Sequence, residues 1–303
     1  MIVRWGLGEL EPLLVELDIA RPMLVASTRW DARELPAAAR WSEVPSHRIE
    51  VPAGCDGVLA AGGGSAIDTA KAASAATRLP LVSVPTTYSG AEWNPHFGVR
   101  DPNRRMVGGG SGANIAGIVY DPNLTLDLPR PVTGGTALNA LAHCVEALYP
   151  ADLEEARRGA GLIVEWLPRV LADLGELEPR TRLLEGASFA GQALAKHGLY
   201  LGHAMAQAIG GRYGLAHGAL NAICLPAAMR FNAEVAPLAL EVVPVETVEE
   251  LARLAGYTRL RDLGVPENEL DEVAEAVAMR PGARANPRPA SVAEIAGLLR
   301  SIW

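Results

Sequence analysis

Residues 56–71 read DGVLAAGGGSAIDTAK, an apolar strand pattern that runs through three glycines directly into a helix pattern. Gly62, Gly63 and Gly64 allow a backbone to approach a ligand closely, and the N–H groups at the start of the following helix favour a phosphate there. Ser65 and Asp68 have the spacing of an N-terminal capping box with Asp in place of Glu. A tight turn that binds nothing is the alternative interpretation, because one glycine-rich turn is not diagnostic.

Similar strands are expected on both sides of this stretch. Apolar runs that end in small or polar turns lie at 22–28, 48–54, 79–87 and 116–122. Near-continuous apolar strands joined by helical crossovers indicate a parallel sheet covered on both faces. From 133 to 301, apolar residues recur at helical spacing with almost no strand pattern. We therefore expect an α/β domain over residues 1–128 and an all-helical domain over residues 129–303.

The composition is that of a globular chain. The 303 residues are 49% hydrophobic, and 27 basic against 35 acidic residues give a formal net charge of −8. This charge opposes attraction to nucleic acid and to anionic lipid. Long uncharged apolar windows are missing and the first residues carry acids, so we expect a cytoplasmic protein with no membrane partner. Cys55, Cys144 and Cys224 lack CxxC spacing, which favours packed, reduced thiols.

A second polar cluster follows the strand at 79–87. The segment VPTTYSGAE, residues 84–92, places Thr86, Thr87 and Tyr88 at the carboxyl end of that strand. Open α/β sheets bind nucleotides and substrates at this end of their strands. The alternative is a turn whose hydroxyl groups satisfy their own backbone.

Polar residues also recur four apart in apolar helices of the second half. Asn139 and His143 share one helix face in TALNALAHCVEALY, His203 and Gln207 repeat the spacing, and His217 follows. Three neutral imidazoles can hold a catalytic zinc, bind an anionic substrate or donate a proton to a carbonyl oxygen. Hydrogen-bonded core histidines are the alternative. The set contains no carboxylate, which argues against a hard cation or a non-haem iron.

Six motifs in this order resemble the iron-containing (group III) alcohol dehydrogenase family. They are GGGSAIDTAK, VPTTYSGAEWNP, IVYDPNLTLDLP, TALNALAHCVEALY, GLYLGHAMAQAIGGRYGLAHG and ANPRPASVAEIAGLLRSIW. Within the family, the PTTY turn, the NPRP segment and Asn139, where metal-dependent relatives carry aspartate, resemble the maleylacetate reductase branch. The resemblance covers nearly the whole chain.

The resemblance implies an architecture like that of dehydroquinate synthase. An N-terminal dinucleotide-binding domain with a reduced parallel sheet would be followed by a helical domain, with the active site between them. It also implies reduction of maleylacetate to 3-oxoadipate by NADH or NADPH. Members of the family are commonly dimers, so we expect a homodimer that acts on a small-molecule substrate.

The resemblance further assigns residues by matching position. It implies cofactor contacts at Gly62, Gly63, Gly64, Ser65, Asp68, Thr86 and Thr87, with Tyr88 beside the nicotinamide. Ser27 and Thr28 stand where NAD-specific relatives carry an aspartate, so NADH and NADPH both stay open. Zinc or iron, if bound, would be held by the residues that match the family's ligand positions: Asn139, His143, His203 and His217.

Four departures from the family pattern concern the site. No helix separates the strands expected at 48–54 and 56–64, so one sheet face would be bare or covered by a partner subunit. Gln207 replaces a histidine assigned to proton transfer or substrate contact, and an amide cannot shuttle a proton at neutral pH. Gly202 replaces the first histidine of a pair. The family's cofactor-side lysine aligns with Arg105 or Met106.

Two functions therefore stay open. The first is an NAD(P)H-dependent reductase of a small, carboxylate-bearing carbonyl or enol substrate. His143, His203 and His217 would orient its oxygen, His143 or His203 would supply the proton, and Tyr88 is a further catalytic candidate. The second is a scaffold that no longer transfers hydride and performs isomerisation, dehydration, cyclisation or ligand binding in the same site.

Overall fold

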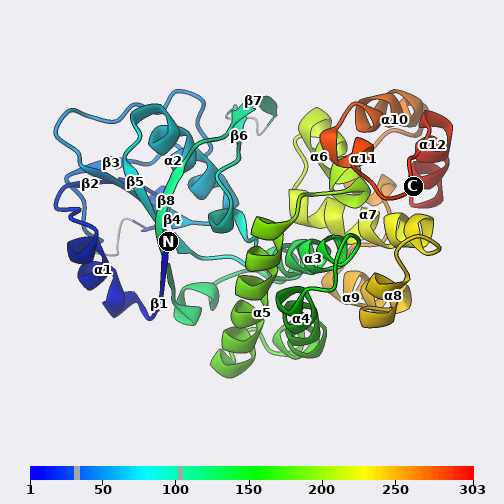
Figure 1. The fold of residues 1–303 in the computed structure, drawn as a ribbon, viewed down its shortest axis with the longest axis horizontal. Coiled ribbons are helices and arrows are strands. Elements are labelled where there is room, and N and C mark those ends of the chain that lie inside the picture. The colour runs from blue at the N-terminus through cyan, green and yellow to red at the C-terminus, as the bar shows by residue number, and fades with distance from the viewer. Residues whose placement is uncertain (31–34, 102–104) are drawn as a thin grey trace. The chain divides into compact units, whose positions relative to one another are not determined.

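The chain forms two compact units. The computed structural model describes residues 1–30, 35–101 and 105–303. Unit 1 comprises Met1–Thr87 and Ala91–Asp127, and unit 2 comprises Tyr88–Gly90 and Leu128–Trp303. In Figure 1 the strands carry the blue to green colours of unit 1, whereas the green to red part of the ribbon is helical. This division of strand and helix agrees with the predicted fold class.

A parallel six-stranded sheet forms the centre of unit 1, in the order β1-β8-β5-β4-β2-β3. Its strands are β1 (Ile2–Trp5), β2 (Pro22–Val25), β3 (Ala39–Trp41), β4 (Gly57–Gly62), β5 (Pro80–Pro85) and β8 (Asn114–Tyr120). Short 3-10 turns complete the connections: η1 (Leu7–Glu9), η2 (Thr28–Trp30), η3 (Ala91–Trp93) and η4 (Pro122–Thr125). A separate antiparallel hairpin, β6 (Phe97–Arg100) and β7 (Met106–Gly110), was not predicted.

Both faces of the sheet are covered by the chain itself. On one face, Leu24 and Leu59 pack with α1 (Leu10–Glu16). On the other face, Met23 and Val58 pack with α2 (Gly64–Thr77). Adjacent strand residues point to opposite faces, so the continuous apolar runs of β2 and β4 supply both clusters.

The strand predicted at 48–54 is wrong, and so is the prediction of a bare or partner-covered face. Residues 42–56 contain no helix or strand. Val44, Ile49 and Val51 from this segment pack against the same cluster as α2. Pro45 and Pro52 lack the N–H group that a ladder requires, so the apolar side chains cover the sheet instead of extending it.

Helices make up unit 2, as the sequence predicts, and no strand occurs among its residues, all of which are described. They are α3 (Arg130–Ala147), α4 (Glu154–Ala172), α5 (Leu177–Lys196), α6 (Leu201–Tyr213), α7 (His217–Asn232), α8 (Pro237–Val242), α9 (Val245–Ala255), α10 (Leu270–Ala278), α11 (Pro281–Arg284) and α12 (Val292–Ser301), with turns η5 (Arg261–Leu263) and η6 (Glu267–Glu269). Helix α3 packs against α4, α5, α7 and α9, so its side chains lie deep within unit 2.

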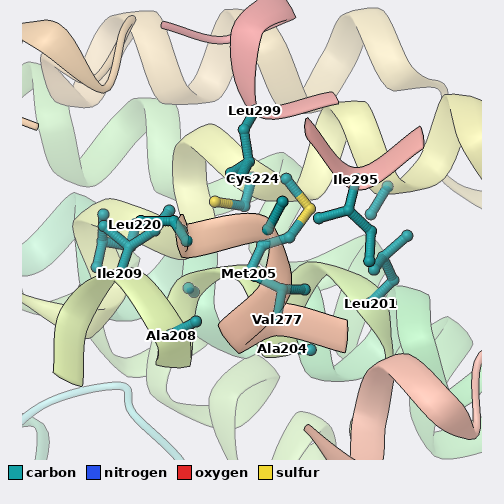
Figure 2. Close-up of a cluster of buried hydrophobic side chains, with 14 of the residues drawn as sticks. Leu201, Ala204, Met205, Ala208, Ile209, Leu220, Cys224, Val277, Ile295 and Leu299 are labelled. Carbon is teal, nitrogen blue, oxygen red and sulfur yellow. The ribbon is translucent and has the colours of Figure 1, made fainter. Parts of the chain in front are cut away.

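One apolar cluster joins α6 and α7 to the C-terminal helices. Figure 2 shows Met205 of α6 and Cys224 of α7 beside Val277, Ile295 and Leu299. These five side chains are fully buried. The cluster therefore fixes the two helices that carry His203 and His217.

Across the described residues, no helix is long and apolar enough to cross a membrane.

Candidate active site

The glycine-rich turn of unit 1 forms a backbone cradle at the end of β4. Helix α2 begins at Gly64, and its N-cap residue, Gly63, has no side chain that could cap it. Gly62 has φ +150°, and a Cβ there would lie 2.8 Å from the Cβ of Ala66. A Cβ on Gly63 would lie 2.8 Å from Cγ2 of Thr87. These close contacts require glycine at both positions, and the backbone N–H groups at the helix start suit a phosphate group.

The other predicted cofactor residues lie at the same edge of the sheet. Thr28 begins η2 just after β2, and Thr86 and Thr87 follow β5. Strands β2, β4 and β5 are parallel neighbours, so their carboxyl ends meet at one edge. Thr86 is fully buried, and its hydroxyl accepts a hydrogen bond of 3.4 Å from Nη2 of Arg29. This edge is where ligands bind in open α/β sheets.

The predicted capping box is wrong. Because Gly63 is the N-cap, Ser65 already lies within the first turn. Asp68 instead accepts a hydrogen bond of 3.2 Å from the backbone N–H of Gly98, and its other oxygen lies 3.5 Å from Nζ of Lys71. Lys71 donates to the carbonyl of His96, and burial lowers its pKa. Asp68 therefore ties α2 to the hairpin strand β6, and its predicted cofactor contact gains no support from this geometry.

Three imidazoles gather within unit 2. The rings of His143 on α3 and His203 on α6 stack, with centroids 4.8 Å apart and planes within 11°. The ring of His217, the first residue of α7, has its centroid 5.6 Å from that of His203. The structure thus brings together the three histidines that the sequence singled out.

A chain of amide groups runs beside the rings. Nδ2 of Asn139 donates to the carbonyl of Ser89 at 2.8 Å. Its Oδ1 accepts from Nδ2 of Asn221, and that same nitrogen lies 3.1 Å from Nε2 of His217. The carbonyl of Ser89 sets the direction of these hydrogen bonds. Because Ser89 offers a carbonyl, Asn139 must present its NH₂ there and its oxygen to Asn221.

Glu146 of α3 is a site residue that the sequence analysis missed. Its carboxylate is fully buried and lies 2.8 Å from Nδ1 of His203. It also accepts the backbone N–H groups of Tyr200 and His203 at the start of α6. The signal was present in the sequence, because a lone acid inside the apolar run ALAHCVEALY needs buried partners.

The rings differ in their surroundings. Burial, and after it the electrostatic effect of the neighbouring His203 and His217 rings, holds the pKa of His143 well below its usual range, so this ring is neutral at pH 7. Among the described residues, Nδ1 of His143 and Nε2 of His203 are buried without a hydrogen-bond partner. Buried polar atoms are normally paired, so these two indicate where a ligand would bind.

A divalent metal ion does not fit the residues present. Over the described ranges, no group of three or more His, Cys, Asp or Glu side chains is arranged to hold one. Oδ1 of Asn139 and Nε2 of His217, two atoms that would face an ion, both lie against the amide nitrogen of Asn221. The oxygens of Glu146 are engaged at α6. Two of the four family-implied ligands thus lack a free donor atom, and the set carries no negative charge.

Tyr88, the further catalytic candidate, is paired with a buried arginine. Its side chain is fully buried in unit 2. The phenol oxygen accepts a hydrogen bond of 3.2 Å from Nη1 of the buried Arg180. Arg180 also donates to the carbonyl of Leu174, so this pair joins the 88–90 segment to α5. The predicted catalytic role of Tyr88 stays a prediction.

Comparison with known proteins identifies the family. Residues 133–303 match the C-terminal model of the Fe-containing alcohol dehydrogenase family, and residues 49–120 match the iron-containing alcohol dehydrogenase model. The chain therefore belongs to the iron-containing alcohol dehydrogenases, a family of oxidoreductases, as its motifs predict.

Several relatives carry a more specific name. Maleylacetate reductase of Pseudomonas sp. strain P51 is 30% identical over 99% of this chain and 95% of its own length. Maleylacetate reductase of Pseudomonas knackmussii is 33% identical over 73% of this chain, but the match spans just 66% of that protein.

Solved structures show the same fold over the whole chain. Maleylacetate reductase from Agrobacterium tumefaciens has a TM-score of 0.86 at 26% identity, covering 100% of this chain and 95% of that one. An iron-containing alcohol dehydrogenase from Corynebacterium glutamicum has a TM-score of 0.87 at 28% identity, covering 100% and 94%.

Proposed function

We propose that this protein is an NAD(P)H-dependent reductase of a small, carboxylate-bearing carbonyl or enol compound, of the kind that maleylacetate reductases act on. The observation that carries the proposal is the imidazole cluster of His143, His203 and His217, in which the first two rings stack. The named relatives support a reductase, and the non-redox alternative gains no support from them. A cytoplasmic homodimer stays a prediction.

The cofactor proposal rests on the glycine cradle of α2. Its helix start, with a glycine at the N-cap, suits the pyrophosphate of a dinucleotide. Arg29 follows Thr28 at the same sheet edge, where an acid would otherwise select NADH. A nearby arginine accommodates a 2′-phosphate, so we propose NADPH as the preferred cofactor.

The chemistry divides between cofactor and chain. A bound dihydronicotinamide supplies a hydride to carbon, and one proton must then reach the substrate to balance the charge. Buried imidazoles are suited to hold and move that proton. His143 is neutral at pH 7 and therefore accepts or donates a single hydrogen bond through each ring nitrogen. The closely packed rings orient the reacting oxygen through these nitrogens.

Dinucleotide titration tests the proposal. NADPH at a hundredfold excess over its Kd should stabilise the folded protein by about 2.7 kcal/mol, seen as a raised melting temperature. Reduction of maleylacetate should accompany NADPH oxidation at 340 nm, the standard absorbance of the reduced nicotinamide. Arg29→Leu is the matched variant and should weaken NADPH binding while leaving NADH binding unchanged. Absence of a thermal shift with either dinucleotide at millimolar concentration would contradict the proposal.

A further inference from the structure

The carboxylate of Glu146 is saturated by donors. One oxygen accepts the backbone N–H of His203 at 3.1 Å, and the other accepts the N–H of Tyr200 at 2.7 Å. The second oxygen also lies 2.8 Å from Nδ1 of His203. Glu146 and His203 are both fully buried, so water does not compete for these bonds. One acid thus holds the ring of His203 and the first turn of the helix that carries it.

This arrangement selects one tautomer of His203. Both oxygens of Glu146 already accept backbone N–H groups, so the carboxylate acts as an acceptor and the ring donates to it from Nδ1. The tautomer of a histidine is set by the bond that one of its nitrogens makes, and here that leaves Nε2 with a lone pair. Nε2 is buried and has no partner within the described residues. His203 therefore meets any ligand through Nε2.

The neighbouring glycine makes room for the acid. A Cβ on Gly202 would lie 3.0 Å from Oε1 of Glu146 and 3.4 Å from the Cβ of Ala228. A larger side chain at 202 would displace the carboxylate or the facing helix α7. The small residue that the sequence presents as a departure from the family is therefore part of the arrangement that holds His203.

We propose that Glu146 is a positioning residue: it fixes His203 as the Nδ1–H tautomer and so makes Nε2 the atom that accepts a hydrogen bond from the enol hydroxyl of the substrate. The contact with substrate rests on the proposed reductase function, whereas the tautomer does not. Glu146 itself touches neither substrate nor cofactor. It acts through the ring, as the buried partners of other catalytic histidines do.

Nitrogen NMR of protein labelled with ¹⁵N-histidine tests the tautomer directly. At neutral pH, the ring of His203 should show a protonated Nδ1 and an unprotonated Nε2, with its signal assigned by its loss in His203→Asn. In Glu146→Leu the single tautomer should be lost, and kcat for maleylacetate should fall about 10- to 100-fold, the usual effect of losing such a partner. The KM for NADPH should change less than twofold, because the glycine cradle is untouched.

Asn286→Ala is the control that separates loss of the His203 tautomer from destabilisation of the first turn of α6. Oδ1 of Asn286 accepts the backbone N–H of Leu201 in the same first turn. Among the described residues, Asn286 forms no hydrogen bond with the ring of His203. It should lower the melting temperature while keeping the tautomer and kcat. A proton on Nε2 with a bare Nδ1 in the wild-type protein would overturn the proposal, as would an unchanged tautomer and kcat in Glu146→Leu. If Glu146→Leu does not fold, or if the protein shows no reductase activity, the NMR spectrum of the wild-type protein alone tests the proposed tautomer of His203.

Discussion

At the scale of single residues, the difference between an amide and an acid determines the direction of hydrogen bonding in unit 2. Asn139 donates to a carbonyl and accepts from Asn221, which an aspartate could not do. Glu146 receives only donors, which an amide could not do. Replacing the amide of Asn139 by an acid, or the acid of Glu146 by an amide, would place two acceptors or two donors against each other in the buried interior of unit 2.

Asn139→Asp should therefore destabilise the protein. The new carboxylate would face the carbonyl of Ser89 at 2.8 Å without a proton between them. Loss of this bond together with a buried unsatisfied acceptor should lower the free energy of unfolding by about 1–3 kcal/mol at pH 7. Urea denaturation in the presence of EDTA measures this without interference from scavenged metal.

Asn268→Asp is the matched control, because Asn268 is exposed. Its effect should stay within about 0.5 kcal/mol, as is usual for surface substitutions. Equal stability of Asn139→Asp and wild-type protein would mean that the Ser89–Asn139–Asn221 chain is not formed in solution.

The candidate residues could be predicted to different extents. Asn139, His143 and His203 stand out because polar groups at helical spacing in apolar helices need a reason to be there. Glu146 has the same signal, but its partners are backbone N–H groups of another helix, which no sequence pattern reveals. The arginine partner of Tyr88 comes from a helix that follows 92 residues later in the chain, so this contact was hidden as well.

At the scale of elements, long periodic segments were predictable and short ones were not. The β4 strand and its following helix are encoded locally by an apolar run and a glycine turn. β3, with only three residues, and the β6–β7 hairpin lack a local period long enough to detect. The prediction of a strand at 48–54 was wrong because the apolar residues of the segment 42–56 cover a sheet face. Burial alone does not distinguish a residue that covers a sheet from one that lies in a strand.

The turn between β4 and α2 provides a test at this scale. In Gly63→Ala the new methyl group would lie 2.8 Å from Cγ2 of Thr87, so the turn must shift or the threonine must rotate. Strain of this kind typically costs about 1–3 kcal/mol. We expect a lower melting temperature and weaker NADPH binding, measured by thermal unfolding with and without the dinucleotide.

Gly161→Ala gives the opposite expectation and serves as the control. Gly161 lies within α4, and an added Cβ would meet nothing within 4 Å. Alanine in such a helix position should stabilise the protein by roughly 0.5–1 kcal/mol and leave dinucleotide binding unchanged. If Gly63→Ala behaved in the same way, the cradle would not be as close-packed as the structure shows.

At the scale of the whole molecule, the three cysteines report separately on the two units. Cys144 on α3 and Cys224 on α7 are fully buried in unit 2, whereas Cys55 in unit 1 is partly exposed. Burial raises the pKa of both unit 2 thiols, so neither forms the reactive thiolate in the folded state. The helices that present the imidazole cluster therefore carry their own probes of unfolding.

A thiol reagent such as Ellman's should distinguish these classes. In the native protein, Cys55 should react quickly, and the other two thiols should react only as unit 2 opens, at a rate that rises with urea. Cys55→Ser should remove the fast reaction and leave the slow one unchanged. Absorbance at pH 8 follows the released thiolate, and mass spectrometry after a brief pulse identifies the modified residue. Rapid modification of Cys144 in the folded protein would mean that α3 is accessible to solvent, and an imidazole cluster built on an exposed helix could not keep water from His143 and His203.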